Sequence, residues 1–124
     1  MTFTPLSDAA VFETPNAVMR TYASPAVGDN SVAVWRTEMV AGAAGPLHAT
    51  DVEQVVVVVD GRLQAVVDGV ERVLVAGDAV VLPPGTPRRL SNAGEGTVVT
   101  VTAAHPGAQA TVGDGDPVPV PWAR

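Results

Sequence analysis

Four polar residues in two segments of this sequence are the strongest candidates for binding or catalysis. His48, Thr50 and Gln54 are two and four positions apart, and residues two apart on a β-strand point to the same face. A neutral imidazole can act as a general base, and a glutamine amide can both donate and accept hydrogen bonds. Arg88, in a later segment, carries a planar guanidinium suited to a carboxylate, phosphate or enolate oxygen. These residue types favour the binding of a small organic molecule, with or without proton transfer.

The same residues are poor metal ligands. A stable divalent site generally needs three or four histidine, carboxylate or thiolate donors, and the chain has no cysteine. Thr50 and Gln54 are weak neutral donors, and the guanidinium of Arg88 has no lone pair to offer. Two unit charges about 4 Å apart interact by roughly 4 kcal/mol at an effective dielectric of 20, and a divalent ion doubles this repulsion. We therefore predict no metal at these residues and no other cofactor.

The elements that hold these residues are predicted to be short β-strands. Glycine and proline interrupt nearly the whole chain, and valine, a strand former, dominates the segments between them. We expect strands near residues 31–40, 48–59, 62–67, 70–75, 79–83, 87–91 and 97–104. The dipeptides Asp60-Gly61 and Asp68-Gly69 are typical of hairpins, and Gly77-Asp78 adds a third turn at similar spacing. The pattern indicates an antiparallel meander within a sandwich or barrel.

The flanks of this block are expected to be less regular. Residues 1–30 are predicted to form an N-terminal extension, with a short helical turn in 7–14 and a possible edge strand at 18–22. Residues 31–106 form the core of a single domain, and 107–124 form an extended tail rich in glycine and proline. Trp122 is the one large apolar residue of this tail, and we expect it to dock on the barrel or on a partner subunit.

Composition excludes several classes of function. The net charge is −6, the chain contains no lysine, and aromatic residues are 4%, whereas nucleic-acid binders usually present a basic face or stacking aromatics. The most apolar run, Val55 to Val59, is far shorter than the roughly 20 residues that a membrane helix needs. The first residues lack the basic and long apolar regions of a secretory signal. We expect a cytoplasmic protein that binds neither nucleic acid nor membrane.

The spacing of two segments resembles the two motifs of the cupin superfamily. The first segment contains Gly42, His48, Ala49, Thr50, Gln54 and Gly61. It is similar to the motif in which a glycine precedes a His-x-His pair, a glutamate follows, and a turn glycine closes the segment. The second contains Gly77, Pro83, Pro84, Gly85, Arg88 and Asn92, and it resembles the second motif, which normally has histidine where Arg88 stands. The two motifs and their connection cover residues 42–92.

This resemblance implies an all-β, single-domain cupin barrel of the jelly-roll type, with a pocket lined by His48, Thr50, Gln54 and Arg88. Only His48 keeps the residue type of the family's metal ligands, which puts metal-dependent chemistry in doubt. Small cupins commonly dimerise, and an open sheet edge invites pairing with another chain, so we also expect a homodimer.

Three functions remain open. The first is a metal-independent lyase, isomerase or cyclase that acts on a small anionic or carbonyl compound. In it His48 is the catalytic base, Arg88 clamps the anion, and Gln54 and Thr50 bind substrate. A nearby guanidinium would help keep His48 neutral, as a base requires. The second is a non-catalytic binding or sensing protein that uses the same groups, and the third is a metal-dependent, dioxygenase-like cupin with unusual ligands.

Each of these residues also has a structural interpretation. Arg88 could form an ion pair with Glu38 or Glu53, or lie in solvent beside Arg89. Thr50 and Gln54 could satisfy each other's hydrogen bonds, and His48 could be a hydrogen-bonded histidine of the barrel wall. On the strand before the first motif, Trp35 and Met39 alternate with Arg36 and Glu38, and the sequence leaves open which pair faces the interior.

Overall fold

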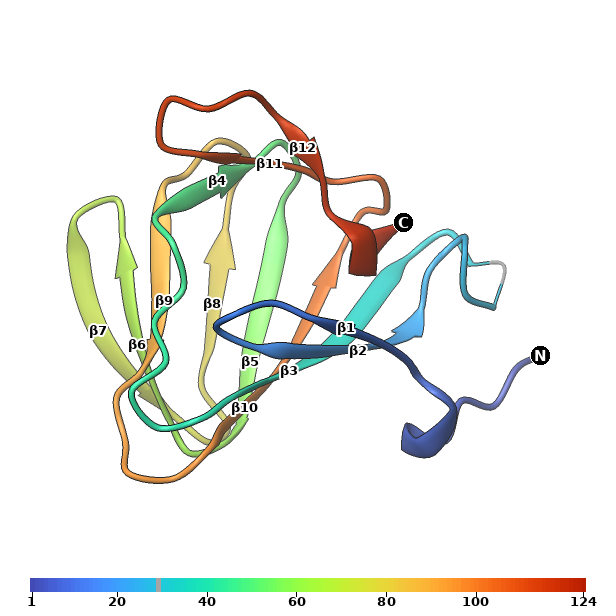
Figure 1. The fold of residues 1–124 in the computed structure, drawn as a ribbon, viewed down its shortest axis with the longest axis horizontal. Coiled ribbons are helices and arrows are strands. Elements are labelled where there is room, and N and C mark those ends of the chain that lie inside the picture. The colour runs from blue at the N-terminus through green and yellow to red at the C-terminus, as the bar shows by residue number, and fades with distance from the viewer. Residues whose placement is uncertain (29) are drawn as a thin grey trace.

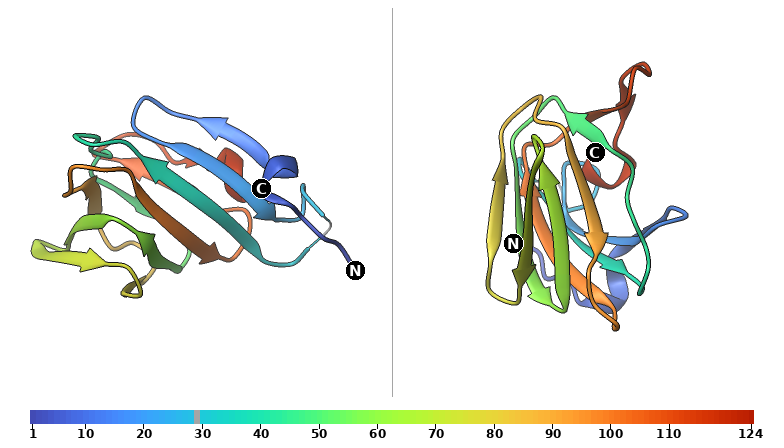
Figure 2. Two further views of the ribbon diagram at one scale, coloured as in Figure 1. Left: turned by 90° about the horizontal axis from the view of Figure 1, so that it is seen from below. Right: turned by 90° about the vertical axis from the view of Figure 1, so that its left-hand side faces the viewer.

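The protein folds as two antiparallel β-sheets that face each other. The computed structural model describes residues 1–28 and 30–124 (Figure 1). In spatial order, the first sheet contains β1 (Ala10–Glu13), β2 (Val18–Ala23), β3 (Ala33–Met39), β10 (Val98–Ala104), β5 (Gln54–Asp60) and β8 (Ala79–Leu82). The second contains β12 (Val118–Pro119), β11 (Gln109–Val112), β4 (His48–Thr50), β9 (Arg88–Asn92), β6 (Arg62–Val67) and β7 (Val70–Val75). The all-β prediction is confirmed, with the strands arranged as the two layers of a jelly roll (Figure 2).

Alternating burial explains why the valine-rich segments form strands. Along β5, Gln54, Val56 and Val58 are buried between the sheets, while Val57 and Val59 are exposed on the outer face. Strand geometry requires this alternation, because successive side chains point to opposite faces. Gln54 therefore points inward, as the predicted pocket requires, and Val56 and Val58 share its face.

The turns differ from the predicted meander. Asp68-Gly69 does close a hairpin between β6 and β7, and the positive φ values of 49° and 78° suit the type I′ turn. At Asp60-Gly61 and at Gly77-Asp78, however, the chain crosses from one sheet to the other. Gly61 has φ 82°, and a Cβ there would lie 2.7 Å from the carbonyl oxygen of Thr97, so the crossing requires glycine.

The segment predicted as one strand over 48–59 is divided between the two sheets. β4 belongs to the second sheet and β5 to the first, with a corner at residues 51–53. Hydrogen bonds hold this corner in place. The Thr50 hydroxyl donates to the carbonyl of Val52, the amide of Gly85 donates to the carbonyl of Thr50, and the Asp51 carboxylate accepts from the amide of Gln109. His48 and Thr50 therefore face Gln54 from the opposite layer.

Both flanks belong to the sheets. At the N-terminus, β2 pairs with β3, and β1 pairs with β2 to form the outer edge; the helical turn is η1 (Leu6–Asp8). The prediction of an extended C-terminal tail needs correction, because β11 pairs with β4 and the turn η2 (Pro121–Ala123) packs near β1, β2 and β3. Trp122 docks on its own chain, and its carbonyl accepts a hydrogen bond of 2.8 Å from the Thr21 hydroxyl.

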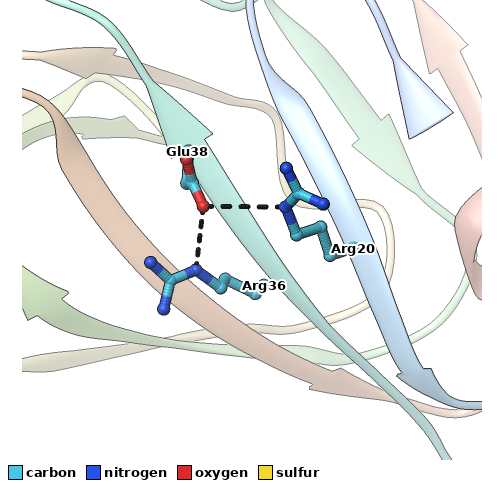
Figure 3. A network of polar contacts seen from close by, with 3 residues as sticks. All are labelled: Arg20, Arg36 and Glu38. Atoms are coloured by element: carbon cyan, nitrogen blue, oxygen red, sulfur yellow. Dashed lines mark hydrogen bonds and ion pairs between the residues drawn. The ribbon is translucent and has the colours of Figure 1, made fainter. Parts of the chain in front are cut away.

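The orientation of β3 answers the question that the sequence left open. Trp35 and Met39 are buried between the sheets, whereas Arg36 and Glu38 lie on the outer face. Figure 3 shows the Glu38 carboxylate between two guanidinium groups, at 3.0 Å from Arg36 Nε and 3.8 Å from Arg20 Nε. Within residues 1–28 and 30–124, no helix is long and apolar enough to span a bilayer.

Candidate functional site

An open cavity of about 420 Å³ lies between the two sheets. Residues from both layers, from the loop at 14–17 and from the C-terminal segment form its wall. The apolar side chains of the wall include Met19, Trp35, Met39, Val56, Leu63, Leu90, Val112 and Trp122. Its polar side chains are Thr14, Asn16, Thr37, His48, Thr50, Gln54, Thr100 and Thr102. The size is within the range of small-molecule sites, which are mostly apolar with a few polar groups.

The site residues predicted from the sequence come together at one part of this structure. His48 lies directly across from Arg88, because β4 and β9 pair at these two residues. His48, Thr50 and Gln54 all line the cavity. Arg88 does not line it: its side chain has 0% exposure and lies behind Thr50 and Gln54.

Arg88 donates its hydrogen bonds to neutral oxygen atoms of the protein. Its Nη2 donates to Thr50 Oγ1 at 2.7 Å and to Gln54 Oε1 at 2.8 Å, and its Nη1 donates to the carbonyl of Thr86 at 2.9 Å. No carboxylate of the described residues lies within ion-pair distance of it. Burial lowers the pKa of Arg88 to about 10, so the guanidinium is still a cation near pH 7.

Neither structural interpretation of Arg88 holds in this arrangement. Glu38 is paired with Arg36 and Arg20 on the outer face, and Arg88 is fully buried, so it forms no ion pair with Glu38 or Glu53 and is not in solvent. Direct contact between Arg88 and a ligand in the cavity is also disfavoured, because Thr50 and Gln54 lie between them. The residue instead forms a buried cation held by uncharged acceptors.

The Thr50 hydroxyl has no hydrogen left to donate to a ligand. Its hydroxyl hydrogen is donated to the carbonyl of Val52, and its oxygen accepts from Arg88. In the Gln54 side chain only Oε1 has a hydrogen-bond partner, which is Arg88. Of Thr50, Gln54 and Arg88, Gln54 is therefore the residue that can still form a hydrogen bond in the cavity.

His48 is held in one tautomer when it is neutral. Its Nδ1 lies 2.9 Å from the carbonyl oxygen of Pro46, and because a carbonyl can only accept, Nδ1 carries the hydrogen. The lone pair of the neutral ring is then on Nε2. Burial lowers the pKa of His48, the hydrogen bond to Pro46 opposes this, and the charge of Arg88 lowers the pKa further. A neutral imidazole with a lone pair on Nε2 can accept a proton.

Several polar residues of the cavity wall were not singled out from the sequence. Thr37 on β3 and Thr100 and Thr102 on β10 are neighbours in the first sheet and line the cavity. The signal was available in part, since Thr37 shares parity with Trp35.

The residues at this position do not fit the metal that the cupin resemblance implies. Thr50 Oγ1 and Gln54 Oε1 already accept hydrogen bonds from Arg88 Nη2, so a guanidinium cation occupies the space beside the two oxygens. A divalent ion there would be repelled by this charge. No group of three histidine or acidic residues that could hold a metal occurs in the described part of the chain.

Comparison with solved structures supports the fold. A sugar phosphate isomerase of the cupin superfamily from Silicibacter pomeroyi superposes with a TM-score of 0.74 at 19% identity, covering 93% of this chain and 83% of the other. An RmlC-like cupin from Shewanella frigidimarina gives 0.73 at 21% identity, covering 85% and 90%. The polyketide cyclase RemF from Streptomyces resistomycificus gives 0.73 at 19% identity, covering 85% and 79%.

Comparison of sequences gives the family. No curated protein matches the chain. The sequence model of the cupin domain, however, matches residues 35–104, which include both motif segments and more than half of the chain. With the two-layered sheet arrangement and the superposed structures, this match shows that the chain belongs to the cupin family.

Proposed function

We propose that this cupin binds a small, uncharged and predominantly apolar organic molecule in the cavity between its sheets, without a metal. One observation carries the proposal: His48 is the only titratable side chain of the cavity wall among the described residues. The remaining wall is formed by apolar side chains, hydroxyl groups and the amides of Asn16 and Gln54. Burying a charged ligand group against such a wall would cost several kcal/mol for lack of a partner.

This proposal changes one part of the expectation from the sequence. An anionic ligand was expected because Arg88 was assigned to the pocket, yet its side chain is fully buried and all of its acceptors belong to the protein. Between the anionic and carbonyl compounds considered above, the cavity supports an uncharged compound.

A second candidate function is proton transfer at His48. The hydrogen bond from Nδ1 to the Pro46 carbonyl favours it, because this bond directs the lone pair of the neutral ring to Nε2. In such a step Nε2 would take a proton from a carbon or oxygen atom of the substrate, and the electron pair would stay on the substrate as an enolate or alkoxide.

The binding proposal can be tested with two dyes of similar size and different charge. Prodan is a neutral aromatic ketone, and anilinonaphthalene sulfonate is an anion; both change their fluorescence in an apolar environment. We expect the protein to bind prodan more tightly than the sulfonate. Tighter binding of the sulfonate would overturn the assignment of an uncharged ligand, and no binding of prodan would overturn the proposal itself.

A matched pair of variants locates the binding. Val112 on β11 is 50% exposed and lines the cavity, whereas Val70 on β7 is 52% exposed and does not line it. Val112→Asp places a carboxylate on the cavity wall and should weaken prodan binding several-fold. Val70→Asp carries the same loss of strand propensity and should leave prodan binding unchanged. Equal effects in the two variants would show that prodan binds elsewhere.

A further inference from the structure

We propose that Arg88 is a positioning residue that fixes the amide of Gln54 so that Gln54 Nε2 donates a hydrogen bond to a carbonyl oxygen of the ligand. This inference rests on the proposed function, since it assigns a polar group to the ligand of the same cavity. It makes Gln54 the residue that selects for a carbonyl compound, and it gives the buried cation a role other than anion binding.

The first step concerns the orientation of the amide. A guanidinium only donates hydrogen bonds, and Arg88 Nη2 lies 2.8 Å from the side-chain amide of Gln54. The atom that faces Arg88 must therefore be the oxygen Oε1. Because the amide is planar and its two ends differ, the amino group Nε2 is turned away from Arg88.

The second step concerns what Nε2 faces. Within the described residues, Gln54 Nε2 donates to no protein acceptor, and Arg88 Nε is the one fully buried side-chain nitrogen or oxygen that lacks a partner. Nε2 therefore keeps some accessible surface, although Gln54 as a whole is only 7% exposed. Since Gln54 lines the cavity, this surface belongs to the cavity. The wall thus offers a hydrogen-bond donor without a partner, among mostly apolar side chains.

The third step concerns why the cation matters. A free glutamine amide can turn over and present either its oxygen or its nitrogen, so it does not distinguish a donor from an acceptor in a ligand. The hydrogen bond from Arg88 removes this freedom, and Thr50 cannot replace it, because its hydroxyl hydrogen is donated to Val52. The positive charge also polarises the amide, which strengthens Nε2 as a donor. A ligand carbonyl oxygen is the acceptor that matches this donor in an uncharged molecule.

The test uses acetylnaphthalene and ethylnaphthalene, which have the same shape and differ in a carbonyl oxygen. Affinities are measured by displacement of prodan, and the quantity compared between variants is the ratio of ketone affinity to hydrocarbon affinity. In Gln54→Glu, Arg88 can still pair with a carboxylate oxygen, but the donor is lost, so we expect the ratio to fall by about fivefold or more. Gln54→Met should lower it similarly.

The role of Arg88 is tested in the same way. In Arg88→Met the amide is free to turn, and we expect the ratio to fall about two- to fivefold while hydrocarbon affinity stays within twofold of wild type. A purely structural role would lower both affinities together and leave the ratio unchanged. As a control, Thr100→Val removes another polar group of the wall and should leave the ratio unchanged.

Each contradictory result has a separate meaning. An unchanged ratio in Gln54→Glu and Gln54→Met, with prodan still bound, overturns the inference and leaves the proposed function standing. A ratio that falls in Thr100→Val instead assigns the carbonyl to Thr100 and overturns the role of Gln54. If wild type binds neither prodan nor the naphthalenes, the proposed function and this inference both fail.

Discussion

Replacing Arg88 with methionine should leave the free energy of unfolding within about 1.5 kcal/mol of wild type, although the side chain is fully buried. Burial lowers the pKa of Arg88 to about 10, and this shift corresponds to roughly 3.5 kcal/mol against the buried cation at about 1.4 kcal/mol per pH unit. Its three hydrogen bonds to neutral acceptors contribute about 1 kcal/mol each, which offsets this cost. Methionine fills much of the same volume without a charge.

The absence of a counter-charge among the described residues is the main reason for this expectation. Removing one member of a buried ion pair costs about 3–5 kcal/mol, because the other charge is left buried. Here the groups left behind are neutral: the Thr50 hydroxyl keeps its bond to Val52, and the Gln54 amide can turn towards the cavity.

Urea unfolding followed by the fluorescence of Trp35 and Trp122 measures the effect. Arg88→Ala is the comparison, and it should cost about 2–3 kcal/mol more than Arg88→Met, because it leaves a void where methionine fills the space. A loss above about 4 kcal/mol in Arg88→Met would show that the cation itself stabilises the fold, and the reasoning from its desolvation would be wrong.

Three further predictions concern pH, metal and assembly. Because burial lowers the pKa of His48, the unfolded chain takes up a proton more readily than the folded one below about pH 6.5. The free energy of unfolding should fall as the pH is lowered from 7 to 5, and His48→Gln should reduce this fall; a slope identical to that of wild type would refute the assignment. Metal analysis should find no stoichiometric transition metal, and chelators should leave the melting temperature unchanged; one zinc, iron, nickel or manganese per chain bound through His48 would contradict this. Light scattering at tens of micromolar should give the mass of a dimer, since the edge strand β8 and its neighbour β5 expose Val57, Val59 and Val81 on the outer face, and a monomer mass would exclude it.

The strands could be predicted because their signals are local. The expected bounds 62–67 and 70–75 agree with β6 and β7, where alternation and an Asp-Gly turn occur together. The partner sheet of each strand could not be predicted in the same way. Asp60-Gly61 and Asp68-Gly69 have similar local chemistry, yet the chain crosses between sheets at the first and forms a hairpin at the second. The difference arises from packing with distant residues such as Thr97 and Val98, which approach Gly61.

The C-terminal segment shows the same limit. Its glycine and proline content favours extended backbone, and this much is compatible with a strand. The composition does not reveal which strand this segment pairs with. Gln109–Val112 becomes β11 because the edge of β4 is available for pairing. Val120 and Ala123 are then buried against Trp35 and Met19 in the core. Tertiary contacts of this kind override a weak local preference.

The sequence predicted which residues face the interior of the site, but only partly what each side chain contacts there. Strand parity and motif spacing brought His48, Thr50, Gln54 and Arg88 together, and all four lie between the sheets or at the cavity. Parity says which face a side chain is on. It does not say whether that side chain ends in open space or against another polar group of the same face.

For Arg88 the outcome follows from counting donors and acceptors. A buried guanidinium has five N–H donors and needs acceptors, and the neighbouring ligand positions of the family hold two neutral oxygen groups here, in Thr50 and Gln54. A carboxylate acceptor would have directed Arg88 elsewhere, but Glu38 lies on the outer face of β3, between Arg36 and Arg20. The three substituted positions therefore hydrogen-bond to one another, while Arg88 Nε has no partner among the described residues. The cation beside Thr50 and Gln54 is the guanidinium of Arg88. His48, the one position that keeps the residue type of the family's metal ligands, lines the cavity.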